Sequence, residues 1–273
     1  NSILWLWRIV RGLTLMSITD ETCFVVGNGE SRKIFGNLDR LQGHGTIYGC
    51  NAIYRDWPNL CDKIFAMNPD MYNEVVAGKE NKNFKADVLG LEQISDWNYI
   101  VESDPPYHMP EGLKIYRTWT GMKPFSNVIK SIDFANSRGS GCSAVLHAAE
   151  QGFKNIFIIA FDILGAQQWE QDSGKSSRIQ NNIYAGTVNY PDRKNMKAYL
   201  KYEWMFQLTQ IARNFSKQHF YFINRKEYIT DNHYLPYYVN HASNNFNAGI
   251  YAELNKFILD PSVLENKKLK WIL

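Results

Sequence analysis

The most constraining feature of this sequence is the alternation of short apolar runs with helix-like stretches. The runs are rich in β-branched and aromatic residues and end at Gly, Asn or Asp. Such alternation is typical of parallel strands covered by helices. The clearest predicted strands are residues 22–26, 46–50, 63–67, 155–161 and 219–223, with weaker candidates at 98–101 and 113–116. We therefore predict an α/β, Rossmann-like doubly wound fold, with a mostly parallel sheet and helices on both faces.

Two stretches carry helical patterns. Residues 143–151 form a compact apolar stretch that Gly152 stops before the run NIFIIAF. A helix, a glycine stop and a buried strand make the second half of a βαβ crossover. In residues 193–217, apolar residues recur at three- and four-residue steps from Met196 to Ile211, which predicts a long amphipathic helix.

Residues 163–192 break this alternation and are polar and rich in Gly and Ser. Connections longer than ~12–15 residues in a compact domain are commonly lids or binding loops. A second polar segment, residues 226–247, is dense in Tyr, Asn and His. We predict one domain over residues 16–273 with a lid at about 163–192, preceded by an extension over residues 1–15.

Composition narrows the class of protein. The chain has 273 residues, of which 45% are hydrophobic, enough for a substantial core. A net charge of +3 from scattered residues gives no support to nucleic-acid binding. The apolar run of the extension is shorter than the ~20 residues of a membrane span, so we expect no transmembrane segment. The sequence leaves the oligomeric state open, a homo-oligomer included.

The four cysteines, Cys23, Cys50, Cys61 and Cys142, form no CxxC pair and have no His at ligand spacing. Neither a zinc site nor a redox dithiol is indicated, and we predict buried free thiols. Free thiols fit a cytoplasmic protein, and the extension leaves peripheral contact with a membrane as an alternative.

Polar residues follow the predicted strands at the point where each strand ends. Ligands of open parallel sheets bind outside the carboxyl ends of the strands, near the point where strand order reverses. The residues at these ends are mostly amides, hydroxyls and glycines, which suit a nucleotide's sugar and phosphate better than a metal. They are Gly27, Asn28, Gly29, Ser31, Asn51, Asn68 and Asp162.

The Gly-Asn-Gly turn does not complete a dinucleotide fingerprint. That fingerprint needs a third glycine at position 32 and an acid ~20 residues further on. Position 32 is Arg and the second strand ends in Asn51, so the nicotinamide interpretation fails. What remains is a turn whose backbone N–H groups, at the start of a helix near Ser31, can approach an anion. A purely structural turn is the alternative.

Four segments resemble the bacterial CMP-sialic-acid-dependent sialyltransferases with a Rossmann-like single domain. They are GNGES at 27–31, GCNAIYRD at 49–56, MNPDMY at 67–72 and SGCSAVLHAAEQGFKNIFIIAFDI at 140–163. The resemblance spans about residues 22–165 in order. The MptE-like pterin diphosphokinases share this scaffold, so the resemblance implies the fold more strongly than the substrate.

The resemblance implies metal-independent, inverting transfer of a sugar from a CMP-linked donor to an acceptor hydroxyl. The partners are then a nucleotide-sugar donor, which is the co-substrate, and a glycan acceptor, with no further cofactor. The implied donor contacts are Gly27, Asn28 and Gly29 at the phosphate and sugar, Asn51 at the nucleotide or sugar, Ser140 with Gly141, and Asp162 at the ribose or lid. Ser31 and Asn68 complete the predicted donor site. Asn51, Asn68 and Asp162 have an alternative role as turn or helix caps.

The expected catalytic base is missing from the lid. The family's lid supplies a Tyr for the phosphate and, three residues on, a His base. The counterpart here, NIYAGTVNY at 182–190, offers Tyr184 but has Thr187 where the His would stand. A threonine hydroxyl takes no proton at neutral pH. His233 and His241, from the second polar segment, are alternative bases.

The sequence is compatible with other functions. The acceptor can be activated differently, or the chain can be a non-catalytic nucleotide- or glycan-binding relative. A diphosphokinase on the same scaffold would need Mg²⁺ and clustered carboxylates. Asp70 and the Glu170/Asp172 pair are available for that purpose besides Asp162.

Overall fold

A computed structural model gives the structure of most of the chain. It describes residues 17–90, 92–103, 115–123, 139–163, 182–190, 199–230, 235–242, 244–266 and 268–273. The extension, His233 and most of the predicted lid lie outside the described residues. The elements are β1 (Thr22–Val26), α2 (Arg32–Phe35), η1 (Leu38–Leu41), β2 (Thr46–Cys50), η2 (Asn51–Arg55), β3 (Lys63–Phe65), α3 (Pro69–Lys82), β4 (Asp87–Leu89), β5 (Glu92–Ser103), β6 (Ile115–Lys123), α4 (Ser140–Glu150), β7 (Asn155–Ile159), α6 (Tyr199–Asn214), β8 (His219–Asn224), α7 (Lys226–Thr230), α8 (Leu235–His241), β9 (Phe246–Ile250), α9 (Tyr251–Leu259) and η5 (Pro261–Val263).

Seven parallel strands form the main sheet in the order β4-β3-β2-β1-β7-β8-β9. Val25 of β1 lies beside Tyr48 of β2 on one side and Ile158 of β7 on the other. The chain builds outward from β1 to β4 and then, in the opposite direction, from β7 to β9. The strand order therefore reverses between β1 and β7, where doubly wound folds bind ligands. The predicted α/β class is confirmed, and this sheet is entirely parallel.

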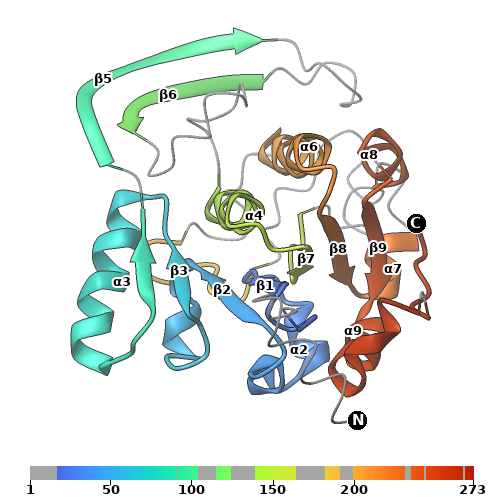
Figure 1. The fold of residues 1–273 in the computed structure, drawn as a ribbon. Coiled ribbons are helices and arrows are strands. Elements are labelled where there is room, and N and C mark those ends of the chain that lie inside the picture. Colours follow the sequence, from blue (N-terminus) through green and yellow to red (C-terminus); the bar gives the residue numbers. More distant parts are fainter. Residues whose placement is uncertain are drawn as a thin grey trace, which may run out of the picture.

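Helices cover both faces of the sheet, with α4, α6 and α8 on one face and α2, α3 and α9 on the other (Figure 1). Side chains along β1 alternate between the two cores. Cys23 and Val25 pack with α4 and α6, whereas Phe24 and Val26 pack with the opposite helices. Because β1 is buried on both faces, it reads as a continuous apolar run.

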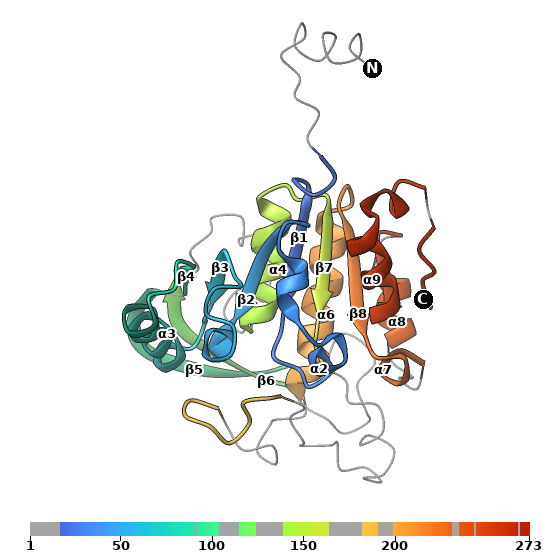
Figure 2. The same ribbon diagram turned by 90° about the horizontal axis from the view of Figure 1, so that it is seen from below.

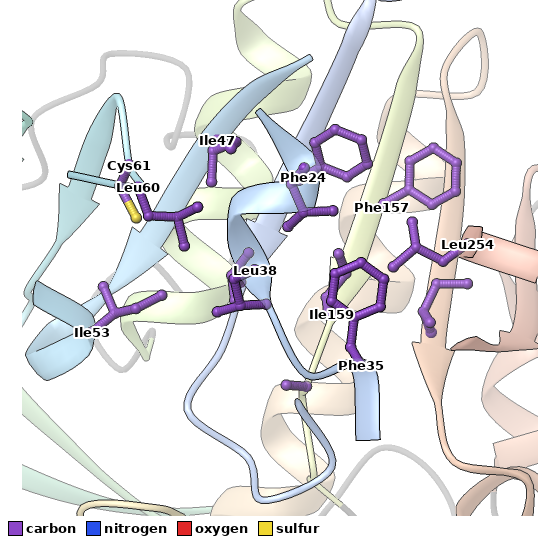
Figure 3. Packing of buried hydrophobic residues seen from close by; sticks show 14 of the residues in the cluster. Phe24, Phe35, Leu38, Ile47, Ile53, Leu60, Cys61, Phe157, Ile159 and Leu254 are labelled. Carbon is purple, nitrogen blue, oxygen red and sulfur yellow. The ribbon is translucent and has the colours of Figure 1, made fainter. Parts of the chain in front are cut away.

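Aromatic rings fill the core beneath α9. Phe24 and Phe157 extend from the neighbouring strands β1 and β7, with ring centroids 5.4 Å apart. Phe257 of α9 lies 4.8 Å from the ring of Phe157. Phe35 and Leu38 close the same core from the segment that follows β1 (Figure 3). Ring contacts thus join α9 to β1 and β7, the two strands between which the predicted site lies.

Some predicted elements end at different residues. β3 stops at Phe65 instead of residue 67, because Met67 N donates to Ser140 Oγ of α4 instead of extending the ladder. β7 stops at Ile159 instead of residue 161, since Ala160 adopts a left-handed backbone with φ of 57°. α4 begins at Ser140, before the predicted residue 143, and α6 covers 199–214 of the predicted 193–217.

The two weaker strand candidates belong to a separate sheet. Residues 98–101 lie within β5, and 113–116 overlap the start of β6; these strands pair antiparallel, with Ile100 opposite Thr118. Figure 1 shows this hairpin apart from the main sheet, on the side of α4. Within the described ranges, no helix is both long and apolar enough to cross a membrane.

The last residues of the chain cover the outer edge of β9. Ala248 N donates to Leu273 O over 3.0 Å, and Ile272 N donates to Ala248 O over 2.8 Å. The ring of Trp271 stacks on Tyr221 of β8 at 4.8 Å. Backbone groups that β9 would otherwise present to a second chain are therefore partly paired.

The four cysteines form no disulfide and are buried, as predicted. Burial raises the pKa of the thiols of Cys23, Cys50 and Cys61, so these groups stay protonated at neutral pH. They act as small apolar side chains of the core.

Candidate functional site

The Gly-Asn-Gly turn packs directly against the end of β7. Gly27 N donates to Ile159 O over 2.8 Å and Gly29 N to Ala160 O over 2.9 Å. A Cβ atom on Gly27 would lie 2.6 Å from Ala160 O, and one on Gly29 would lie 2.4 Å from Asp162 Cγ. Both glycines thus permit a close approach of two backbones. Their N–H groups are already used, so an anion at this turn would have to contact other groups.

Asp162 joins the turn to the ends of β7 and β8. Ser31 N donates to Asp162 Oδ2 over 2.9 Å, the Ser31 hydroxyl donates to Oδ1, and Asn224 Nδ2 lies 3.1 Å from Oδ1. Burial raises the pKa of Asp162, and the hydrogen bonds from Ser31 and Asn224 oppose that rise without cancelling it. α2, which follows Ser31, has only four residues. Asp162, which follows β7, therefore contacts Ser31, which follows β1, across the point where the strand order reverses. Its contact with a ribose stays a prediction.

Asn51 and Ser140 meet although 89 residues separate them. The Ser140 hydroxyl donates to Asn51 Oδ1 over 2.7 Å and accepts from Met67 N over 3.0 Å. Asn51 has a φ of 51°, a left-handed conformation that Asn tolerates better than most residues. A Cβ atom on Gly141 would lie 2.5 Å from the Phe161 ring. The carboxyl ends of β2 and β3 are thereby tied to the start of α4.

Asn68 caps α3. Its side-chain oxygen accepts from Asp70 N over 2.9 Å and from Met71 N over 3.3 Å. This is the capping role that the sequence left open as the alternative to donor binding.

Residues 182–190, which we call the lid segment, pack on the strand ends of β1 and β2. Ile183 N donates to Asn28 O over 2.9 Å, and Asn28 Nδ2 donates to Tyr190 Oη over 3.0 Å and to Cys50 O over 2.7 Å. Figure 2 shows this segment, drawn in gold, at the end of the molecule where β7 points. The lid segment is thus held at the carboxyl edge of the sheet, next to Asn28.

A buried guanidinium links the turn to the lid segment. Arg32 is 4% exposed and donates to Asn28 Oδ1 over 3.0 Å, to Tyr184 Oη over 2.8 Å and to Asp56 Oδ2 over 2.9 Å. The Tyr184 hydroxyl donates to the same Asp56 oxygen over 2.7 Å. Burial raises the pKa of Tyr184, so this hydroxyl stays protonated at neutral pH.

A second arginine fastens the lid segment to α3. The Arg55 guanidinium binds both oxygens of Glu74 over 2.7 and 2.8 Å and donates to Thr187 Oγ1 over 2.7 Å and to Val188 O over 2.9 Å. Asn189 Nδ2 donates to Glu74 Oε2 over 2.8 Å. Burial raises the pKa of Glu74, but the hydrogen bonds from Tyr54, Asn189 and Arg55 outweigh burial and hold that pKa below its ordinary value. Glu74 is therefore ionised at neutral pH.

The structure gathers part of the predicted site into one network. The Ser140 hydroxyl donates to Asn51, the side chain of Asn51 lies beside the Tyr190 hydroxyl, and that hydroxyl accepts from Asn28. The Thr187 hydroxyl already has two hydrogen-bond partners, since it donates to Tyr184 O over 2.6 Å and accepts from Arg55. For His241 the structure describes only its place in the backbone of α8, and Asn68 lies at the start of α3.

Sequence reasoning missed the charged half of this network, namely Arg32, Asp56 and Arg55. The motif GCNAIYRD already contains Arg55 and Asp56, and Arg32 follows Asn28 by four residues. Their pairing depends on the lid segment, whose position the sequence does not give. In the part of the chain that the structure describes, His, Cys, Asp and Glu residues form no group of three that could hold a metal ion.

Comparisons of the chain with protein-family models, with curated proteins and with solved structures found no match. The resemblance of the four motifs therefore stands as a hypothesis, to be judged by the chemistry of the site.

Proposed function

We propose that this protein is a glycosyltransferase that moves a sugar from a CMP-linked donor to an acceptor hydroxyl, with inversion and without a metal. The observation that carries the proposal is the row of neutral polar side chains formed by Ser140, Asn51, Tyr190 and Asn28. A cytosine base and a ribose offer uncharged donors and acceptors, which amides and hydroxyls match. The row lies at the carboxyl ends of β1 and β2, beside the reversal of strand order.

The charged half of the network supports the same reaction. When CMP departs, negative charge develops on its phosphate, and cations stabilise that charge. Arg32 and Arg55 lie over the ring of Tyr184, at 5.3 and 5.5 Å from its centroid. We assign the phosphate to this end of the network, because the N–H groups of Gly27 and Gly29 already donate to Ile159 O and Ala160 O.

Nucleotide-dependent thermal stabilisation tests the proposal. CMP, CDP, UDP and ATP are each added with and without Mg²⁺, and CMP alone should stabilise the protein. At a hundred times Kd, a ligand adds about 2.7 kcal/mol to the free energy of unfolding, which for a chain of this size raises Tm by roughly 5–10 °C. Stabilisation only by ATP with Mg²⁺ would favour a diphosphokinase, and no response to any nucleotide would contradict both enzymes.

Hydrolysis of CMP-sialic acid then tests the site itself. Asn51→Ala removes the amide that links β2 to α4, and we expect CMP release to fall by at least tenfold, because a hydrogen bond worth about 1.4 kcal/mol changes a rate tenfold. Asn59→Ala is the matched control, since Asn59 is exposed and precedes β3 at the opposite edge of the sheet. CMP binding without any turnover in the wild type would favour a non-catalytic nucleotide-binding protein.

A further inference from the structure

Asp56 is a half-exposed carboxylate at the lid end of the network. Its side chain is 46% exposed, while its partner Arg32 is 4% exposed. Both hydrogen bonds to Asp56, from Arg32 and from the Tyr184 hydroxyl, end on Oδ2. Among the described residues, Oδ1 accepts no hydrogen bond. One oxygen is thus fixed in place by two donors while the other is open to a ligand.

We propose that Asp56 is the general base of the transfer; the inference rests on the proposed glycosyl transfer. The acceptor oxygen forms a bond to the anomeric carbon of the donor sugar, and its proton passes to Asp56. The bond between that carbon and the phosphate oxygen breaks, and CMP leaves with the electron pair. The proton is released from Asp56 to solvent after the products depart, so atoms and charges balance.

Position and chemistry favour Asp56 over Thr187. A general base must reach the proton and be unprotonated at the working pH, as a carboxylate is. The Thr187 hydroxyl is held between Tyr184 O and Arg55 and is no base at neutral pH. Asp56 accepts a hydrogen bond from the Tyr184 hydroxyl, so its carboxylate lies beside the lid segment. In the family that the motifs resemble, the lid supplies the base.

The pairing with Arg32 couples proton transfer to departure of the phosphate. While Asp56 is ionised, it balances the charge of Arg32 across 2.9 Å. Once Asp56 takes the acceptor proton, the guanidinium charge is no longer balanced, at the moment when the leaving phosphate gains negative charge. The stabilisation is therefore stronger in the transition state than in the bound donor, as catalysis requires.

The groups that face Asp56 come from three neighbouring elements. They are Arg32 of α2, Tyr184 of the lid segment and Arg55 of η2, the last paired with Glu74 of α3. Both arginines keep their charge, and burial raises the pKa of Tyr184. The pKa of Glu74 lies below its ordinary value. The charges around Asp56 are therefore fixed near neutral pH.

The test uses CMP-sialic acid as donor and compares two nucleophiles, lactose and azide. Lactose must lose a proton, whereas azide attacks as an anion and needs no base. In Asp56→Asn, transfer to lactose should fall by about 100- to 10,000-fold. Transfer to azide should not fall below that of the wild type, and CMP should bind at least as tightly, because the charge of Arg32 is then no longer balanced. Asp87→Asn, an exposed carboxylate at the start of β4, is the matched control.

The outcomes separate this inference from the proposed function. A wild type that neither binds CMP nor consumes CMP-sialic acid overturns the transferase, and the role of Asp56 with it. An active wild type with undiminished lactose transfer by Asp56→Asn overturns the role of Asp56 alone, as does an equal loss with lactose and azide. If Asp56→Asn does not fold, Asp56→Glu keeps the charge. It should lose up to roughly 100-fold in rate with lactose, and an unchanged rate overturns the inference.

Discussion

A guanidinium buried beneath a loop needs acceptors inside the protein, and Arg32 has them in Asn28, Asp56 and Tyr184. The same residue occupies the position at which a dinucleotide fingerprint has its third glycine. An arginine in place of this glycine changes the chemistry of the turn. A glycine allows close packing without a side chain, whereas Arg32 places a fixed positive charge in the loop and orders the lid segment. Lysine could not serve here, because a single ammonium does not present the planar fork that reaches separate acceptors.

Asp162 is another residue whose chemistry depends on burial, and it predicts a pH effect on stability. Its pKa is raised above the ordinary value of 3.8, because burial outweighs the hydrogen bonds from Ser31 and Asn224. The folded state therefore holds a proton at Asp162 more firmly than the unfolded chain. The resulting contribution to stability is fully present below 3.8 and is lost as the pH rises through the higher folded pKa.

The variant Asp162→Asn isolates this contribution, because it does not titrate. We expect the difference in free energy of unfolding to move in favour of the wild type as the pH falls from neutral toward 4. Urea denaturation at several pH values measures the difference, with Asp87→Asn as the exposed control. A difference that is constant with pH, or that favours the variant as the pH falls, would show that Asp162 is not destabilised by its charge.

Among the elements, the lid segment is fastened to α3 in part by Arg55. Arg55 joins Glu74 of α3 to Thr187 and Val188 of the lid segment and lies over two of its tyrosine rings. In Arg55→Ala we expect the lid segment to open more often. Its backbone amides, including the donors Ile183 N and Tyr190 N, should exchange hydrogen at least tenfold faster, since loss of two hydrogen bonds costs about 1.5–3 kcal/mol.

Hydrogen–deuterium exchange read by mass spectrometry checks this expectation. Peptides from β1 and β7 serve as internal references, because these strands lie in the middle of the sheet. Lys85→Ala removes an exposed positive charge elsewhere and should leave the exchange of the lid segment unchanged. Equal protection in wild type and Arg55→Ala would mean that the contacts of Asn28 and Arg32 hold the lid segment without Arg55.

The strands that could be predicted from the sequence are those whose own residues form a recognisable apolar run. β1 and β2 begin and end where predicted, because burial on both faces makes each a short, mostly apolar run. β9 was missed because FNAGI carries an amide and a glycine within five residues, and its place depends on pairing with β8. The site divides in the same way: strand-end residues such as Asn51 follow from the pattern, whereas the partners of Arg32 come together only through the fold.

At the scale of the whole molecule, the sheet places its candidate site in the centre and its weak points at the edges. The reversal of strand order between β1 and β7 sits in the middle of seven strands. Edge strands present unpaired backbone groups on which other chains can add. β4 is short, with three residues, whereas β9 has five and is covered by the last residues of the chain.

Trp271 fastens this cover, and its removal should expose the edge of β9. The indole stacks on Tyr221 at 4.8 Å and fills the space above Gly249, where a Cβ atom would lie 2.7 Å from Trp271 Cε3. In Trp271→Ala we expect a loss of about 3 kcal/mol in the free energy of unfolding, from lost packing. Detachment of residues 271–273 should also produce association that increases with protein concentration.

Urea denaturation and light scattering over a range of protein concentrations measure the two effects separately. Ile272→Ala is the matched control: its side chain is 37% exposed, and the backbone bonds to Ala248 do not depend on it. That variant should lose less than about 1 kcal/mol and show no new association. Association by both variants would place its origin outside the stacking of Trp271. Loss of stability in Trp271→Ala without association would show that the cover stabilises β9 but is not what keeps its edge from pairing with a second chain.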